Sequence, residues 1–133
     1  MSCKNTILIV DDNNIDRELV IGLLDDNNIN IINACDGLEA LTYLRNNNPD
    51  LILLDIELKD GNGKTFLKDN KELIISKNNI PVLFISGNVT PTIIRDCLKL
   101  GAVDILRKPF IFEEIILKVD LWIDYKRKDQ EII

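Results

Sequence analysis

The segment Leu51-Ile52-Leu53-Leu54-Asp55 consists of four consecutive aliphatic residues followed directly by a carboxylate. A short, wholly apolar run of this kind is typical of a β-strand that is covered on both faces, as in a parallel sheet. Such a strand has no structural need for a charge at its end, and burying an unpaired carboxylate costs free energy. Asp55 therefore indicates a functional site where a central strand stops.

Strand and helix patterns alternate along the chain. Four more segments have the composition of strands, at 7–10, 29–34, 82–85 and 103–106. Apolar residues at helical spacing predict five helices, over about 14–26, 37–46, 64–76, 91–101 and 112–125. This alternation predicts an α/β fold, a doubly wound (βα)5 protein with a five-stranded parallel sheet of order 2-1-3-4-5 and helices on both faces.

The length of 133 residues predicts one domain, with its core in about 4–125 and a charged, solvated tail at 126–133. The three cysteines, Cys3, Cys35 and Cys97, lie far apart and lack the spacing of a zinc or redox motif. We expect reduced thiols, with Cys35 and Cys97 as small buried hydrophobic side chains.

The charge of the chain narrows the possible functions. The net charge is −6 and histidine is absent, which excludes histidine catalysis or ligation by this chain and argues against direct binding of nucleic acid. The N-terminus lacks a signal-peptide pattern, and no apolar run approaches the roughly 18 residues of a membrane span. We therefore expect a cytoplasmic protein without a membrane contact.

Polar side chains follow four of the five predicted strands. Asp11 and Asp12 follow the first strand, Asp55 the third, Ser86 the fourth, and Lys108 comes just after the fifth. Taken singly, they have ordinary explanations as helix caps, a turn residue and a surface lysine. Parallel strands end along one edge, however, and ligands bind where the strand order reverses, which is between strands 1 and 3. Their joint placement predicts one site.

The three carboxylates predict a divalent cation. At an effective dielectric constant of about 20, two like charges 4 Å apart cost about 4 kcal/mol. Mg²⁺ suits them because it is a hard ion that takes oxygen ligands, and Mn²⁺ is a substitute. Without the metal we expect raised carboxylate pKa values. A cis bond between Lys108 and Pro109 would aim the ammonium back across the strand ends, where it suits a phosphoryl group.

Together these residues resemble the response-regulator receiver domain, the phosphoacceptor of two-component systems. The resemblance extends from about Lys4 to Tyr125. It is carried by Ile9-Val10-Asp11-Asp12, Leu53-Leu54-Asp55-Ile56, Gly63, Ile85-Ser86-Gly87, and Gly101-Ala102 followed by Lys108-Pro109-Phe110. The doubly wound strand order is itself a property of this family, so the topology and the resemblance are not independent predictions.

The resemblance implies a role for each acidic residue. Asp55 would be the nucleophile that accepts a phosphoryl group from the phosphohistidine of a histidine kinase or a phosphotransfer protein. Asp12 and Asp55 would ligate Mg²⁺ directly, Asp11 would help through water, and the backbone carbonyl of Glu57 would complete the protein ligands. The domain would gain and lose its phosphate without being a turnover enzyme.

The resemblance also implies a switch. Ser86 and Lys108 would each contact a phosphoryl oxygen, and phosphorylation would pull Ser86 inward and shift the loop 87–90. Two pre-existing states would change their populations. The fifth strand and the helices on either side of it would present the output surface, for a downstream target, an output domain or a second copy of the chain.

Three positions depart from the usual receiver pattern. Ile105 stands where receivers usually carry an aromatic or histidine switch residue, so rotation of a ring cannot report the phosphate here. Lys59 replaces a frequent proline, and Glu57 adds an acid near the metal that would alter the dephosphorylation rate. None of these changes removes a group that phosphorylation itself needs.

Two other functions remain open from the sequence. Ile105 favours a degenerate receiver that docks to partners independently of phosphate, whereas the intact acidic residues and Lys108 oppose it. A haloacid-dehalogenase-type phosphohydrolase also uses an aspartate at a strand end, and Asp55-Ile56-Glu57 faintly resembles its motif. In those hydrolases the acid pair follows the nucleophile, whereas here Asp11 and Asp12 precede it.

Overall fold

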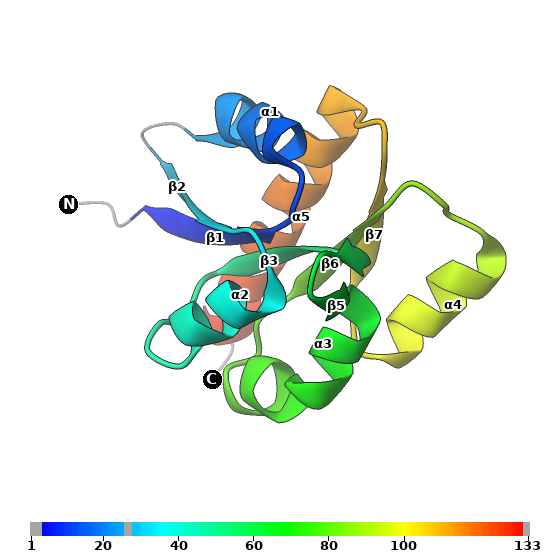
Figure 1. Ribbon diagram of the computed structural model, residues 1–133. Helices are drawn as coiled ribbons and strands as arrows, with labels where there is room; N and C mark the ends of the chain where they lie inside the picture. The colour runs from blue at the N-terminus through cyan, green and yellow to red at the C-terminus, as the bar shows by residue number, and fades with distance from the viewer. Residues whose placement is uncertain (1–3, 26–27, 132–133) are drawn as a thin grey trace.

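A five-stranded parallel sheet forms the centre of the protein (Figure 1). The computed structural model describes residues 4–25 and 28–131, with side chains as far as Lys126. The sheet has the order β2-β1-β3-β6-β7, where the strands are β1 Asn5–Val10, β2 Ile29–Ala34, β3 Leu51–Asp55, β6 Val82–Ser86 and β7 Asp104–Arg107. Counted along the sheet strands alone, this is the predicted order 2-1-3-4-5, so the doubly wound α/β fold is confirmed.

Helices cover both faces of the sheet (Figure 1). They are α1 Asn14–Leu24, α2 Gly37–Leu44, α3 Gly63–Asp69, α4 Pro91–Lys99 and α5 Phe112–Glu131. Side chains of α1 and α5 pack with one set of strand residues, and side chains of α2, α3 and α4 pack with the alternate set. Every residue of β3 and β6 is buried, which explains why these strands read as continuous apolar runs.

The strand register brings the acidic residues to one level. Val10 pairs with Leu54 across β1 and β3, so that Asp11 follows directly beside Asp55. Asp55 in turn pairs with Ile85 across β3 and β6. The edge of the sheet beyond these pairs is where the loops after β1, β3, β6 and β7 meet.

Two segments differ from the sequence-based elements. The helix predicted over 64–76 is divided, because α3 ends at Asp69 and a π-helix, η1, runs over Glu72–Lys77. The predicted loop after β3 contains a two-stranded hairpin, β4 Glu57–Leu58 and β5 Gly61–Asn62. The described part of α1 ends at Leu24 and α2 ends at Leu44, slightly before the predicted ends.

Two predictions of exposure and burial were wrong. Lys126 is buried with 7% of its surface exposed, because α5 continues past Tyr125 and Lys126 Nζ approaches the carbonyl oxygen of Pro49 at 3.4 Å. Cys35 is only half-buried, and its thiol donates to Glu39 Oε2 at 2.6 Å, so it is not a core side chain. Cys97 is buried as expected, and Cys3 lies outside the described residues.

The described helices contain no stretch that is both long and apolar enough to cross a membrane.

Candidate functional site

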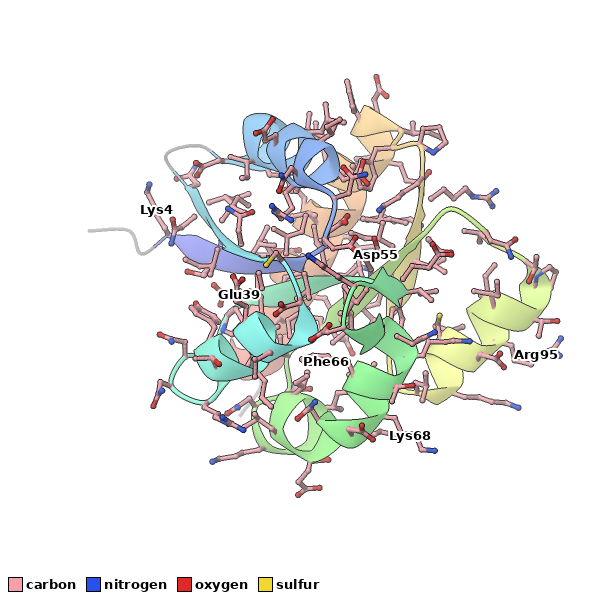
Figure 2. All side chains as sticks on the ribbon, in the orientation of Figure 1. Lys4, Glu39, Asp55, Phe66, Lys68 and Arg95 are labelled. Atoms are coloured by element: carbon pink, nitrogen blue, oxygen red, sulfur yellow. The ribbon has the colours of Figure 1, made fainter. Side chains whose placement is uncertain are left out.

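Three carboxylates converge at the carboxyl edge of the sheet. Oxygen atoms of Asp11, Asp12 and Asp55 all lie within 4.8 Å of one another. Asp11 and Asp55 are buried at the ends of β1 and β3, whereas Asp12 is exposed. Figure 2 labels Asp55 at the end of β3. The structure therefore confirms that the carboxylates from β1 and β3 lie close together.

The chain after β3 folds back to hold Asp55 in place. Asp55 Oδ1 accepts a hydrogen bond from the backbone N–H of Glu57 at 2.9 Å. The β4–β5 hairpin then returns the chain, and the N–H of Gly63 donates to the carbonyl oxygen of Ile56 at 2.6 Å. A Cβ atom on Gly63 would lie 2.1 Å from the carbonyl oxygen of Asp55. This close approach explains why the position carries glycine.

Lys108 reaches the carboxylates from the end of β7. Its peptide bond to Pro109 is cis, as predicted, and its backbone N–H donates to the carbonyl oxygen of Ser86 at 2.9 Å. Lys108 Nζ lies 2.7 Å from Asp55 Oδ2 and 3.0 Å from Asp11 Oδ2. Burial opposes the charged ammonium, but the contacts with carboxylates outweigh it and raise the pKa of Lys108 above its usual range.

A further acidic residue at this site was missed by the sequence analysis. Asp16 lies in the first turn of α1, and its Oδ2 is 2.7 Å from Lys108 Nζ. The signal was available, because Asp16 follows Asp12 by four residues and therefore falls about one helical turn away, at the same end of the sheet. It was overlooked because an acid in a first helical turn has an ordinary explanation, the attraction to the helix dipole.

Negative charge is in excess at the site. One ammonium faces four carboxylates, those of Asp11, Asp12, Asp16 and Asp55. Burial raises the pKa of Asp11 to about 6, and the charge of Asp55 adds to the rise, although the hydrogen bond from the N–H of Asn13 and the nearby ammonium of Lys108 oppose it. The expectation of a raised carboxylate pKa is confirmed for Asp11.

The donor set fits a hard divalent cation. Asp11 Oδ2 is fully buried and accepts no hydrogen bond within the described residues, although Lys108 lies at ion-pair distance. An orphaned, buried oxygen beside two further carboxylates is the set of ligands that Mg²⁺ takes, and Mg²⁺ would fill its remaining positions with water. Asp11, Asp12 and Asp55 would therefore hold the ion.

The Ser86 hydroxyl points to its own loop. Ser86 Oγ donates to the carbonyl oxygen of Asn88 and accepts from the N–H of the same residue, both at 3.0 Å. The described contacts of the hydroxyl thus do not include Asp55. Ser86 nevertheless ends β6 directly after Ile85, which pairs with Asp55, so the hydroxyl lies one residue beyond the level of that carboxylate.

Ile105 lies in the core beneath α4. It is 9% exposed and belongs to the cluster that includes Cys97 and Ala102. Its backbone carbonyl accepts from Lys118 Nζ of α5 at 2.8 Å. At this position, then, an aliphatic side chain packs in the core where receivers usually carry an aromatic ring.

Comparison with known proteins identifies the family. The model of the response regulator receiver domain matches residues 7–120. The chain belongs to this family. Receiver domains of this family bind Mg²⁺ through acidic residues and work with histidine kinases and output domains, and an acidic cluster of that kind is present here.

Individual relatives support the same family assignment. A transcriptional regulatory protein, YcbL, from Bacillus subtilis (strain 168) is 38% identical over 116 residues, which are 85% of this chain and 48% of that protein. The response regulator MprA of Mycobacterium sp. (strain KMS) is 32% identical, again over 85% of this chain and 48% of the relative. The chain therefore spans about half the length of these curated relatives.

A solved structure supports the same conclusion. A two-component response regulator from Clostridium difficile superimposes with a TM-score of 0.83 at 28% identity, covering 91% of this chain and 97% of that one.

Proposed function

We propose that this receiver domain accepts a phosphoryl group on Asp55 from the phosphohistidine of a histidine kinase or phosphotransfer protein, in a reaction that needs Mg²⁺. The observation that carries the proposal is the position of Asp55. Its Oδ2 lies 2.7 Å from Lys108 Nζ, and its carboxylate shares a 4.8 Å cluster with Asp11 and Asp12. A nucleophilic oxygen, a fixed cation and a site for a second cation thus lie close enough together to act on one phosphoryl group.

The chemistry of the transfer follows from these groups. A carboxylate oxygen of Asp55 forms the new bond to phosphorus, while the bond from phosphorus to the donor nitrogen breaks and the imidazole keeps the electron pair. Lys108 offsets the charge on the phosphoryl oxygens, and the buried site keeps donor and acceptor in line. Bound Mg²⁺ would supply further positive charge at those oxygens. The product is an acyl phosphate, which water later hydrolyses.

We propose that the signal leaves through the loop after β6 and the surface of α4, β7 and α5. Ser86 would exchange its bonds with Asn88 for a phosphoryl oxygen, which would release the loop 87–90. Because Ile105 is a core side chain rather than a surface ring, movement of this loop and α4 would carry the response. The partner would be a downstream protein, an output domain or a second copy of this chain.

The test is an intact-mass measurement after incubation with acetyl phosphate and Mg²⁺. We expect the wild-type protein to gain one phosphoryl group and the Asp55→Asn variant to gain none. A docking module that acts without phosphate would leave both masses unchanged. A phosphohydrolase would consume acetyl phosphate rapidly without a stable gain in its own mass, and either result would overturn the proposal.

The control is Asp25→Asn. Asp25 ends α1 as its C-cap residue, at the end of the helix remote from Asp16 and Lys108. This variant has the same change of charge and mass as Asp55→Asn, and we expect it to be phosphorylated like the wild type.

A further inference from the structure

Three carboxylates lie within ion-pair distance of the Lys108 ammonium. A lysine side chain has three N–H bonds. Lys108 Nζ lies 2.7 Å from Asp55 Oδ2, 2.7 Å from Asp16 Oδ2 and 3.0 Å from Asp11 Oδ2. Three carboxylates thus share this ammonium, and a phosphoryl oxygen would compete with them for it.

Asp16 differs from the other two partners of Lys108. Asp11 and Asp55 belong to the cluster of oxygens within 4.8 Å that fits a divalent cation, and Asp16 does not. The metal and the phosphoryl group would take over the oxygens of Asp11 and Asp55. The side chain of Asp16 is 20% exposed and stands in the first turn of α1, where its N–H donates to Asn13 Oδ1. Its backbone is fixed in the first turn of the helix, and its carboxylate would stay free of the metal and able to pair with Lys108.

We propose that Asp16 is a positioning residue that retains Lys108 on the α1 side of the site and competes with the phosphoryl group for its ammonium. The inference rests on the proposed function, because it concerns the same lysine and the same phosphate. It follows that Asp16 limits how strongly the phosphorylated state is stabilised, and so limits the rate of phosphorylation and the fraction of phosphorylated protein.

Removing the charge of Asp16 should remove one competitor for the ammonium of Lys108. In Asp16→Asn the side chain keeps its size and an acceptor oxygen, but it no longer attracts the ammonium as an ion. The phosphoryl group is itself an anion, so the same substitution removes a repulsion close to it. We expect roughly fivefold tighter binding of a phosphoryl analogue, the size of effect that a partly exposed ion pair has.

The experiment is a titration with beryllofluoride at saturating Mg²⁺, followed by fluorine NMR, on four proteins. They are the wild type, Asp16→Asn, Asp16→Glu and Glu18→Gln. Glu18 is exposed on the same helix, so Glu18→Gln changes the net charge by the same amount without touching Lys108. Asp16→Glu keeps a carboxylate within reach of the lysine. The Mg²⁺ affinity of each protein, measured by calorimetry, sets the saturating concentration, and circular dichroism checks the fold.

The outcomes separate this inference from the proposed function. We expect tighter binding in Asp16→Asn alone, with Asp16→Glu and Glu18→Gln close to the wild type. If the wild-type protein does not bind beryllofluoride, the proposed function itself is wrong. If the wild type binds and Asp16→Asn binds equally or more weakly, only the role of Asp16 is overturned. Equal tightening in Glu18→Gln would show a general effect of charge and would also overturn it.

Discussion

Strand β7 has a lysine–aspartate network at each end, and the two networks are built differently. At its start, Asp104 accepts hydrogen bonds from the indole of Trp122 at 3.0 Å, from Lys118 Nζ at 3.1 Å and from the N–H of Ile105 at 2.8 Å. Burial opposes the charge of Asp104, but these donors outweigh it and lower the pKa of its carboxyl group. This network has enough donors for its acid, and it ties β7 to α5.

Beyond the other end of β7, carboxylates outnumber the positively charged groups that contact them. In the part of the chain that the structure describes, Lys108 is the ammonium that faces these four carboxylates, and one buried oxygen of Asp11 accepts no hydrogen bond. The pKa of Asp11 is raised to about 6. A protein gains no stability from such an excess of carboxylates in the absence of a second cation. An acid with enough hydrogen-bond donors therefore indicates a structural role, whereas an excess of buried carboxylates indicates a binding site for a ligand.

The position of Asp55 at the acidic site can be disturbed by a substitution that changes no charge. In Gly63→Ala the new Cβ would lie 2.1 Å from the carbonyl oxygen of Asp55, so the hairpin must move away from the nucleophile. We expect a loss of about 3 kcal/mol in the free energy of unfolding, measured by urea denaturation. Gly22→Ala is the matched control, because nothing lies within 4 Å of its Cβ and helix α1 should gain about 0.5–1 kcal/mol. A stable Gly63→Ala protein would contradict the close packing.

The excess of acid predicts a large response to metal at this end alone. At a Mg²⁺ concentration one hundredfold above its dissociation constant, the wild-type protein should gain about 2.7 kcal/mol of stability. Asp12→Asn removes one of the three clustered carboxylates and should lose most of this gain, while its stability without metal stays unchanged or rises. Thermal denaturation with and without Mg²⁺ measures both effects. An equal gain in wild type and Asp12→Asn would place the metal elsewhere.

At the Asp104 end of β7, we expect a substitution to reduce stability and to leave phosphorylation unchanged. Asp104→Ala leaves the indole N–H of Trp122 and the ammonium of Lys118 without this acceptor, and we expect a loss of about 2 kcal/mol in the free energy of unfolding. Phosphorylation by acetyl phosphate should proceed at the wild-type rate under conditions where the variant is folded. A variant of normal stability, or one with a changed phosphorylation rate, would remove the distinction between the two networks.

The pH dependence of stability should also differ between the two ends. The pKa of Asp11 is raised from 3.8 to about 6. The folded state therefore binds a proton more tightly than the unfolded state, and without Mg²⁺ stability should rise by on the order of 1–2 kcal/mol as the pH falls from about 6.5 to 4. Asp104 has a lowered pKa, so its contribution is present above pH 3.8 and is lost as the pH falls through its folded-state value.

Urea denaturation across this pH range, in metal-free buffer, measures the first of these effects. In Asp11→Asn the free energy of unfolding should vary less between pH 4 and 6.5. The loss of stability at lower pH should remain. A profile that is unchanged in Asp11→Asn would show that another group is responsible.

The sequence was sufficient for the sheet and for most of the site. Buried strands such as Leu51–Leu54 are continuous aliphatic runs, and the parallel register then brings Asp11 and Asp55 to one level whatever the loops do. The cis bond before Pro109 and the burial of Cys97 were also predicted, the first from a Lys-Pro pair at a strand exit and the second from the apolar character of an unpaired cysteine.

Other features depend on tertiary contacts that have no local signal. The π-helix Glu72–Lys77 contains neither glycine nor proline, and nothing in its composition separates it from the preceding helix. Lys126 reads as part of a solvated tail, and only the passage of α5 beneath Pro49 buries it. Asp16 and Lys108 are 92 positions apart in the sequence. Their contact depends on how helix α1 and the segment after β7 are placed relative to each other, which the local sequence does not specify.

The role of Asp55 as the phosphoacceptor is tested by locating the phosphoryl group chemically. The protein is incubated with acetyl phosphate with and without Mg²⁺, reduced with borohydride, which converts an acyl phosphate to an alcohol, and digested for peptide mass analysis. We expect Asp55 to be reduced to homoserine, and only in the Mg²⁺ sample. Reduction at a different aspartate, or equal reduction of Asp55 without Mg²⁺, would contradict it.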